Sequence, residues 1–484
     1  MDTATYQSCL DILGDSNRQT EERFAAMTQA FPRSVEFGQP EQMLSALCAL
    51  RDDIQDDATL VSSEDFISLE LNIVFLHNQL GHKAETDEAV QRWMQRLRTD
   101  DQLSAVLRIH IINTCYHVFY YRGRNQEFEE LIPLCISALK EEGLSDKVRS
   151  QVCSMLALMF HAVIDQENAL YYAQEANKYA LRTDAKHLTF FISTTLSSVY
   201  LFGGQLTKVR ALCDENSSEV PERVAIYSKF HYLVGQVAEG QGDISEHKAT
   251  LLRWLEEYQE PKAPRFKMSL LVALAWCALI ESNAKELSLR LGTLLRESAT
   301  FDRAYSHQIE LLMLMSRLLH GDWIDTEPAH EFLPDVQVGQ VAFYQWLHGE
   351  PVDVDDSYCH PISRWLVTHL KAQPQPLKVL RGRSNHALGV ICFPDGVERD
   401  ISRRGAMMNL LQVLLCAKTK GRGFVSTNEL FEAGWPDVKG FPKNGQRRVY
   451  TELHRLKEWG VEISSGRDGY ALVNYAVWLQ GADL

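Results

Sequence analysis

Apolar residues recur at helical spacing through most of the chain and are interrupted at regular intervals by short polar turns. Between residues 62 and 347 the turns come 38 to 42 residues apart. The residues that mark them are Gly81, Gly123, Asp165, Gly203, Gly242, Asn283 and Gly321. Each turn follows a strongly apolar segment and precedes a more polar, amphipathic one, which predicts paired helices. One helix pair cannot bury both of its apolar faces, so we expect the pairs to stack into an α-solenoid.

The repeated pairs resemble tetratricopeptide-type repeats. In one unit, small residues stand at steps of four and three, at Ala169, Ala173 and Ala176, where paired helices approach closely. The period exceeds the usual length of about 34 residues, and most units lack the tryptophan and the Leu-Gly pair of that family. The repeats therefore look more like the divergent, longer ones in the sensor arms of large bacterial regulators. A HEAT-like solenoid is the structural alternative.

Prolines mark the limits of this repeat body. Residues 1–60 have a helical pattern that prolines interrupt, and we expect an N-terminal helical cap there. Residues 61–370 form the helical-repeat body. Residues 371–376 contain two prolines, which cannot continue a helix and favour an extended linker. Residues 377–484 then form a separate C-terminal domain, so the predicted fold is mainly α with a small α+β domain at the end.

The periodicity changes after the linker. Short strands are predicted at residues 377–380, 387–393 and 397–401, and a turn at residues 394–396 joins the last two. A helix then begins near Arg404 and ends in a glycine-rich turn. Its apolar face is formed by Met407, Leu410, Leu411, Leu414 and Leu415.

Two further helices and a hairpin follow. Ser426 and Glu429 form a capping-box pattern, which begins the second helix. Asn444 is a suitable N-cap for a third helix, which ends at Gly460. The last predicted element is a two-stranded hairpin whose turn spans residues 464–469.

The third helix has two chemically different faces. Val449, Leu453 and Leu456 fall on one side at steps of four and three. Between residues 443 and 457 there are five basic residues and one acidic residue. The opposite side and its flanks carry Arg447, Arg448, Tyr450, Thr451, His454, Arg455 and Glu458. This arrangement predicts one face packed in the domain core and one exposed face that is rich in arginine.

This order of strands, three helices and a hairpin resembles the OmpR/PhoB-type winged-helix effector domain. The residues that match are Val425-Ser426, Glu429-Leu430, Trp435-Pro436, Arg448-Val449-Tyr450, Leu453, Arg455-Leu456 and residues 468–472. The resemblance implies that the third helix enters the DNA major groove and that the hairpin, or wing, lies near the adjacent minor groove. The DNA-binding residues it implies are Lys443, Asn444, Arg447, Arg448, Tyr450, Thr451, His454, Arg455 and Arg467. Arginine suits such contacts, because its guanidinium can bind guanine or phosphate through two hydrogen bonds.

The charge of the chain is divided between its two parts. The net charge is −15, but residues 376–484 carry 16 Lys and Arg against 11 Asp and Glu. An acidic body with a basic C-terminal module is compatible with double-stranded DNA as a partner. Glu452 and Glu458 depart from the basic pattern of the family, and the small excess of +5 points to a homodimer or tandem sites as a source of affinity. A winged helix that has become a protein-docking module is the alternative.

Other functional classes lack their motifs. We find no GxxxxGK[ST] loop, no receiver domain and no Ser/His/Asp or HExxH constellation, so we expect neither catalysis nor a cofactor. Cys359-His360 has no second ligand pair at zinc spacing, so no metal is expected. The sequence has no long apolar run and no signal-peptide pattern at its start, which predicts a cytoplasmic protein without membrane contact. Buried free thiols are expected at the cysteines within apolar helical patterns: Cys115, Cys135, Cys153, Cys277 and Cys416.

The repeat body offers a surface for a protein or small-molecule effector. His110 and His117 are seven residues apart and could share a helix face with Asn113 or Thr114. Further candidates, which could instead pack between helices, are Tyr116, Tyr120, Tyr121, His161, Tyr171 and Tyr172. The leading hypothesis is a bacterial one-component transcription regulator whose body senses the effector and whose C-terminal domain binds operator DNA. The alternatives are an adaptor whose repeats and winged helix both bind proteins, and an oligomer that coats DNA.

Overall fold

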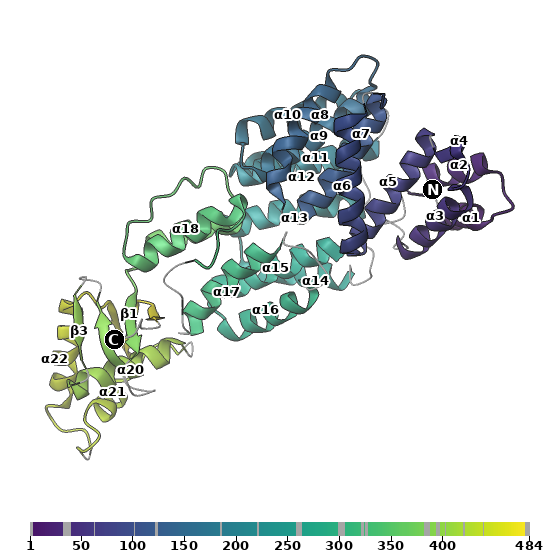
Figure 1. Ribbon diagram of the computed structural model, residues 1–484. Helices are drawn as coiled ribbons and strands as arrows, with labels where there is room; N and C mark the ends of the chain where they lie inside the picture. The colour runs from purple at the N-terminus through teal and green to yellow at the C-terminus, as the bar shows by residue number, and fades with distance from the viewer. Residues whose placement is uncertain are drawn as a thin grey trace. The chain divides into compact units, whose positions relative to one another are not determined.

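The structure is a computed structural model in which the chain is mainly α. It describes residues 3–31, 40–61, 63–100, 102–121, 124–183, 186–219, 222–257, 264–298, 305–320, 324, 328–381, 388–393, 397–401, 403–419, 422–438 and 440–479 (Figure 1). The chain divides into two compact units, Met1–Leu271 with Leu294–Ser306 and Val272–Thr293 with His307–Leu484. No helix among the described residues is both long enough and apolar enough to span a membrane.

The N-terminal helices share a core with the first helix of the repeat body. These helices are α1 (Thr3–Gly14), α2 (Thr20–Ala30), α3 (Pro40–Ile54), α4 (Ala58–Val61) and α5 (Glu64–Gln79). From α5, Leu69 and Ile73 pack into the N-terminal core. Ile67 and Leu71 of the same helix belong to the core of the following repeats. Because α5 is buried on two faces, the N-terminal helices cover the apolar surface at the start of the repeats.

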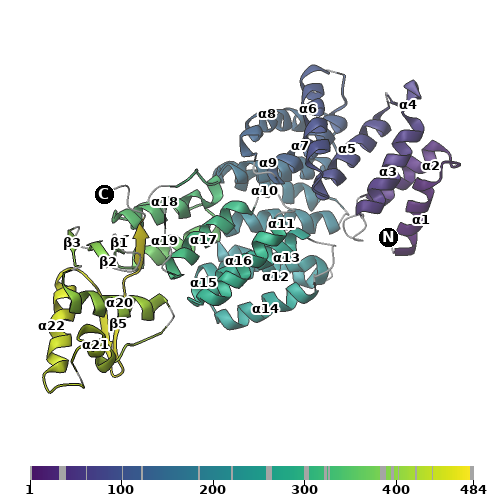
Figure 2. The same ribbon diagram turned by 60° about the horizontal axis from the view of Figure 1, so that its bottom comes forward.

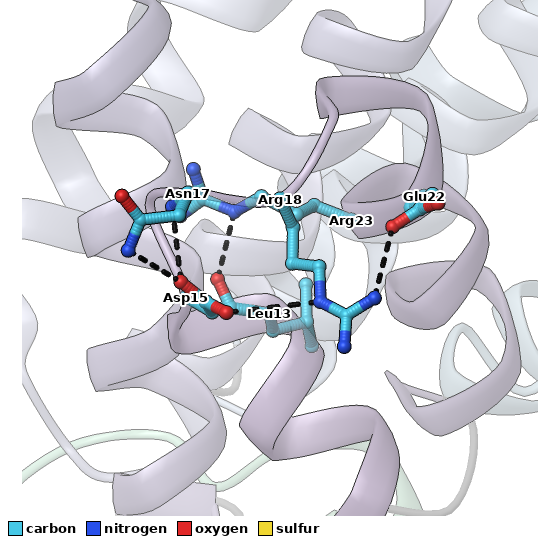
Figure 3. A network of polar contacts seen from close by, with 6 residues as sticks. All are labelled: Leu13, Asp15, Asn17, Arg18, Glu22 and Arg23. Atoms are coloured by element: carbon cyan, nitrogen blue, oxygen red, sulfur yellow. Dashed lines mark hydrogen bonds and ion pairs between the residues drawn. The ribbon is translucent and has the colours of Figure 1, made fainter.

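The turn between α1 and α2 is fixed by polar contacts (Figure 3). Asp15 Oδ1 accepts hydrogen bonds from the backbone and the side-chain amide of Asn17, at 3.0 and 3.1 Å. The guanidinium of Arg23 is buried; its Nε donates to the Leu13 carbonyl at 2.9 Å, and its Nη1 lies 2.8 Å from Asp53 Oδ2. This buried cation therefore links the end of α1 and the start of α2 to α3.

The repeat body consists of helix pairs, as the hydrophobic pattern predicted. The pairs are α5 with α6 (Lys83–Thr99), α7 (Ala105–Tyr121) with α8 (Phe128–Leu139), α9 (Asp146–Ala162) with α10 (Gln166–Ala180), α11 (Lys186–Phe202) with α12 (Leu206–Glu219), α13 (Glu222–Ala238) with α14 (Ile244–Glu257), and α15 (Pro264–Ile280) with α16 (Ala284–Ser298). A 3-10 turn, η2 (Asn125–Glu127), precedes α8. Ala169, Ala173 and Ala176 of α10 are fully buried, which agrees with the close helix approach that their spacing predicted.

The turns within successive pairs share one hydrogen-bond pattern. A backbone amide donates to the carbonyl five residues earlier at His82, Asp165, Gln205, Gln241 and Asn283, with N–O distances of 2.8 to 2.9 Å. This is a Schellman C-cap, and it requires a residue with positive φ near the helix end. Glycine takes that position at Gly81, Gly204 and Gly240, whereas Ile164 (φ 61°) and Ser282 (φ 53°) take it in two other turns. The predicted turn residues Gly123 and Gly321 lie outside the described residues.

The second unit ends in helices α17 to α19 and a mixed α/β module. Its elements are α17 (Ser306–His320), α18 (Pro334–His348), α19 (Pro361–Ala372), β1 (Leu377–Arg381), β2 (Leu388–Cys392), β3 (Glu398–Asp400), α20 (Gly405–Thr419), α21 (Thr427–Gly434), α22 (Gly445–Glu458), β4 (Ile463–Gly466), β5 (Gly469–Leu472) and β6 (Ala476–Leu479) (Figure 2). Strands and helices therefore follow one another in the order that the sequence predicted. The predicted turn at residues 394–396 lies outside the described residues.

The strands form two sheets. The larger has the order β3-β2-β1-β6, in which β2 is antiparallel to β1 and β3, while β6 runs parallel to β1. Strands β4 and β5 form the hairpin. The apolar face predicted for α20, including Met407, Leu410 and Leu414, is buried in the core of this module. The strand β6 was not predicted from the sequence.

The linker predicted at residues 371–376 is held from both sides. The indole of Trp346 in α18 donates to the Pro374 carbonyl at 3.2 Å. The side-chain amide of Asn474, which follows β5, donates to the Gln375 carbonyl at 2.8 Å. Residues 371 and 372 are the last residues of α19, so only residues 373–376 are non-helical, and they lie inside the second compact unit.

The cysteines are free thiols, and most of them are buried. Burial raises the pKa of Cys115 and Cys153 to about 12, so both remain protonated thiols at neutral pH. The prediction that Cys416 is buried is wrong, because this residue is exposed. It follows Leu414 and Leu415, which occupy the core face of α20, and the next position on the helix turns toward solvent.

Candidate functional site

Helix α22 presents the amphipathic arrangement that the sequence predicted. Val449, Leu453 and Leu456 are buried in the core of the C-terminal module. All nine residues that the winged-helix resemblance implied as DNA-binding are exposed: Lys443, Asn444, Arg447, Arg448, Tyr450, Thr451, His454, Arg455 and Arg467. Eight of them lie in α22 or directly before it, while Arg467 lies at the hairpin turn.

Two glycines let the helices of this module approach closely. A Cβ atom on Gly434, at the end of α21, would lie 2.3 Å from Leu410 Cδ1 of α20. A Cβ on Gly445, at the start of α22, would lie 3.2 Å from the ring of Phe441. These contacts seat α21 on α20 and fix the first turn of α22 on the loop before it.

The N-terminus of α22 is open to solvent. Asn444 occupies the predicted N-cap position, but its side chain makes no capping hydrogen bond. Its backbone (φ −101°, ψ 5°) is not in the extended conformation that directs an N-cap side chain toward the following amides. The first turn contains no acidic residue. The positive end of the helix dipole is therefore not neutralised by a carboxylate within the helix.

The cations on the exposed face differ in their partners. Arg455 Nη1 lies 2.7 Å from Glu452 Oε1, one helical turn earlier. Among the described residues, no carboxylate forms an ion pair with Lys443, Arg447, Arg448 or Arg467. The hydroxyl of Thr451 donates to the Arg447 carbonyl at 2.8 Å, so it is already used within the helix. Cations without an ion pair among the described residues thus stand at the N-terminal half of α22 and at the hairpin, and Lys457 adds one at the C-terminal end of the helix.

The hairpin is fixed to the segment before α21. Val425 and Tyr470 exchange two backbone hydrogen bonds, at 2.8 and 2.9 Å. Gly469 has φ 130°, and a Cβ atom there would lie 2.0 Å from the Val425 carbonyl oxygen. The strands pair up to Gly466 and Gly469, so the turn is shorter than the predicted 464–469, and Arg467 stands exposed at its tip.

The capping box predicted for α21 is half formed. Ser426 Oγ accepts from the Glu429 amide at 3.2 Å, as expected. The Glu429 carboxylate instead binds Arg422, with both guanidinium nitrogens 2.8 Å from its oxygens. This ion pair lowers the pKa of Glu429 below its usual value.

A second candidate site lies on the repeat body. A pocket of about 440 Å³ is lined by residues of α7, α9 and α11, the first helices of three successive pairs. Its lining residues are Val106, Ile109, His110, Asn113, Tyr116, His117, Val148, Gln151, Ser154, Met155, Leu158, Leu188 and Phe191. The predicted common face of His110, Asn113 and His117 is therefore present, and it belongs to a pocket.

The other aromatic and histidine candidates have different surroundings. Tyr120 packs on the repeat core, and Tyr172 stacks on Phe160 with ring centroids 5.6 Å apart. His161 is buried with its ring 4.1 Å from that of Phe202. Tyr171 is exposed. The side chain of Tyr121 lies outside the described residues. Packing between helices thus accounts for several of these candidates, while Tyr116 and His117 contribute to the pocket.

One group of described side chains has the composition of a metal site: His307, Glu310 and His330. His330 Nε2 lies 2.9 Å from Glu310 Oε2. However, His307 Nδ1 accepts a hydrogen bond from the Leu333 amide. The neutral ring then carries its proton on Nε2, which has no lone pair for a metal, whereas a metal-bound histidine donates through its other nitrogen. We interpret this group as a hydrogen-bonded cluster.

Cys359 and His360 are used in the structure of α19. His360 Nδ1 accepts from the Ile362 amide at 3.2 Å and caps the helix. Burial raises the pKa of the Cys359 thiol to about 11. Neither side chain is presented to a ligand in this arrangement.

Comparison with known proteins finds distant structural similarity. No protein family model matches the chain, and no curated protein matches it. Among solved structures, the chain is similar to a Rap protein complexed with competence and sporulation factor, at 14% sequence identity and a TM-score of 0.41, over 62% of this chain and 82% of that one. It is also similar to the apo form of RapI, at 13% identity and a TM-score of 0.39, over 72% of this chain and 97% of that one. Similarity this low supports no conclusion about activity or partners.

Proposed function

We propose that the protein is a DNA-binding transcription regulator whose C-terminal module is an OmpR/PhoB-type winged helix. The observation that carries this proposal is the exposed face of α22, where Arg447 and Arg448 stand without a carboxylate partner among the described residues. The hairpin beside this helix adds Arg467 at its tip. The repeat body would then supply the contact through which an effector acts.

The dimensions of α22 suit a DNA groove. A helix with its side chains is about 10–12 Å wide, and the major groove of B-DNA is about 12 Å wide. Arg447 and Arg448 lie in the first turn of α22, where the helix dipole is positive. Lys443 precedes this turn, so the same end of the helix can bind a phosphate through its amides and this ammonium group.

The acidic residues of α22 limit this electrostatic attraction. Glu452 compensates Arg455, and the exposed Glu458 ends the helix. One module therefore offers few uncompensated cations, and specific affinity would come from two copies of the chain on a two-fold-symmetric site. A homodimer on DNA is part of this proposal.

The direct test is selection of binding sites from random duplex DNA by the full chain. We expect a recurring sequence motif, and we expect Arg448→Ala to weaken binding to it by about 1–3 kcal/mol if Arg448 contacts a base. Arg253→Ala is the matched control, because this arginine of α14 is also exposed and belongs to the other unit. Retention of duplexes without any common motif, or equal binding by both variants, would refute sequence-specific recognition through α22.

A second candidate function is a protein-binding adaptor, and one observation favours it. Large apolar side chains are exposed around α21, at Phe424, Val438 and Phe441. Exposed apolar residues of this size occur at protein interfaces. Val438→Ser would then abolish capture of a partner while leaving DNA binding unchanged, because Val438 lies between α21 and α22 and is exposed. The opposite result, loss of DNA binding without loss of a partner, would support the regulator.

A further inference from the structure

The pocket of the repeat body has the size of a small-molecule site. Its volume is about 440 Å³, within the range of about 300–1,000 Å³ that ligand pockets occupy. It is lined by α7, α9 and α11, and all three helices contribute side chains at helical spacing. The pocket therefore belongs to the packed repeats rather than to a connecting loop.

The walls of the pocket are already fixed by core contacts. Tyr116 is buried and its ring packs 5.7 Å from that of Phe128. Ser154 of α9 and Thr195 of α11 are buried and hydrogen-bonded to each other at 3.1 Å. Two of the lining helices are thus joined at Ser154, which itself lines the pocket. A preformed site of this kind binds a ligand without a large cost for ordering side chains.

The rim of the pocket is apolar and unusually exposed. Val106 of α7 is 56% exposed, and Phe191 of α11 is 55% exposed. Both are lining residues, and they come from different helices. A ligand with an apolar body would cover these two side chains, and removing their apolar surface from water favours binding.

The polar side chains of the pocket include no carboxylate, ammonium or guanidinium group. His110, Asn113 and Gln151 line it, and burial lowers the pKa of His110 to about 4. A neutral imidazole has one donor and one acceptor nitrogen, and the two side-chain amides add further donors and acceptors. None of the described lining residues is Asp, Glu, Lys or Arg.

We propose that this pocket binds an uncharged small molecule with an apolar body and a polar group that forms hydrogen bonds with His110, Asn113 and Gln151. A charged ligand would lose its hydration in the pocket without meeting an opposite charge, which disfavours its binding. A short peptide with free termini carries such charges at both ends, so the pocket composition favours a small neutral compound. This inference goes beyond the proposed function, because it does not depend on DNA binding.

The test uses two fluorescent probes of opposite electrostatic character on the full chain. Nile red is a neutral, apolar molecule with a hydrogen-bond-accepting carbonyl, whereas 8-anilinonaphthalene-1-sulfonate is an apolar anion. We expect saturable binding of one Nile red per pocket and at least tenfold weaker binding of the anion. Equal affinity for the two probes would overturn the proposal of an uncharged site.

Rim variants then locate the bound probe. Val106→Glu and Phe191→Glu should each weaken Nile red binding at least tenfold, because they place a carboxylate at the apolar rim. Both residues are exposed, so the substitutions leave the helix cores intact, which thermal unfolding verifies. Leu289→Glu is the matched control, since Leu289 is a 65% exposed leucine of α16 outside the pocket. Unchanged binding in both rim variants would overturn the proposal, as would equal weakening by the control.

A third variant tests the polar part of the pocket. Asn113→Asp keeps the shape of the side chain and introduces one negative charge. We expect Nile red binding to weaken at least tenfold, because a carboxylate needs hydration that the bound probe would displace. Binding that is insensitive to Asn113→Asp would show that the probe does not reach the polar wall and would refute the assigned hydrogen-bonding group.

Discussion

The number of uncompensated cations near α22 determines how steeply DNA binding should depend on salt. Lys443, Arg447, Arg448 and Arg467 are exposed and form no ion pair among the described residues, whereas Arg455 is bound to Glu452. Each phosphate contact releases condensed counterions and contributes about −0.9 to the slope of log K against log salt. Four contacts give a slope of about −3.6 per bound module. Between 50 and 200 mM salt, affinity would then fall by roughly 150-fold.

Substitutions in α22 test which cations contribute to the slope of log K against log salt. The double variant Arg447→Ala, Arg448→Ala should reduce the slope to about −1.8, so that the same change in salt weakens binding by roughly 12-fold. Arg455→Ala serves as the control within the same helix. Because its guanidinium already neutralises Glu452, its removal should leave the slope near the value of the unmodified protein.

Fluorescence anisotropy of a labelled duplex, titrated with the full chain at four salt concentrations, measures these slopes. Circular dichroism confirms that each variant retains its helices. The reasoning is refuted if the double variant keeps the original slope. It is equally refuted if Arg455→Ala lowers the slope as much as Arg448→Ala, because the ion pair would then not determine which cations contact phosphate.

Three further predictions concern the scaffold. Burial lowers the pKa of His161 to about 4, so the unfolded chain takes up a proton first as pH falls below 6.5. The free energy of unfolding should therefore drop by up to about 3 kcal/mol between pH 6.5 and pH 4, and chemical denaturation of His161→Leu should lack this part of the pH dependence. Gly469→Ala should destabilise the hairpin by at least about 2 kcal/mol, because a Cβ atom would clash with the Val425 carbonyl; unchanged amide exchange of the hairpin would contradict this. Ser282→Gly should raise the free energy of unfolding by about 0.5–1 kcal/mol, and Gly81→Ala should lower it by about 1 kcal/mol, since both positions have positive φ. Thermal unfolding distinguishes the two signs.

The sequence predicted the elements whose signal is local. The two faces of α22 follow from the spacing of Val449, Leu453 and Leu456, because helical periodicity alone decides which residues turn toward the core. The order of strands and helices in the C-terminal module followed in the same way. The helix pairs of the body could be predicted because the spacing of the turns between them is visible along the chain.

The features that sequence reasoning missed depend on distant parts of the chain. Strand β6 pairs in parallel with β1, and nothing near either strand specifies a partner about 100 residues away. The pocket unites Asn113 with Gln151 and Phe191, which lie on separate repeats, so periodicity could place only the α7 residues on one face. Glu429 completes half of its predicted capping box because Arg422 competes for its carboxylate. That competition is also invisible in the local pattern.

If the C-terminal module binds DNA as proposed, the connection at residues 373–376 affects which operators the protein can bind. Trp346 and Asn474 hold the adjacent carbonyls of Pro374 and Gln375, so strand β1 follows α19 through a fixed connection rather than a flexible linker. A recognition helix on a flexible linker can reach half-sites at many separations. A recognition helix on a rigid connection requires a fixed spacing between the half-sites and a fixed helical phase. Under the proposed function, DNA binding by a dimer should tolerate base changes in the spacer between half-sites but not the insertion of half a turn of DNA. Trp346→Phe or Asn474→Ala would remove one of these hydrogen bonds and should widen the range of half-site spacings to which the protein binds.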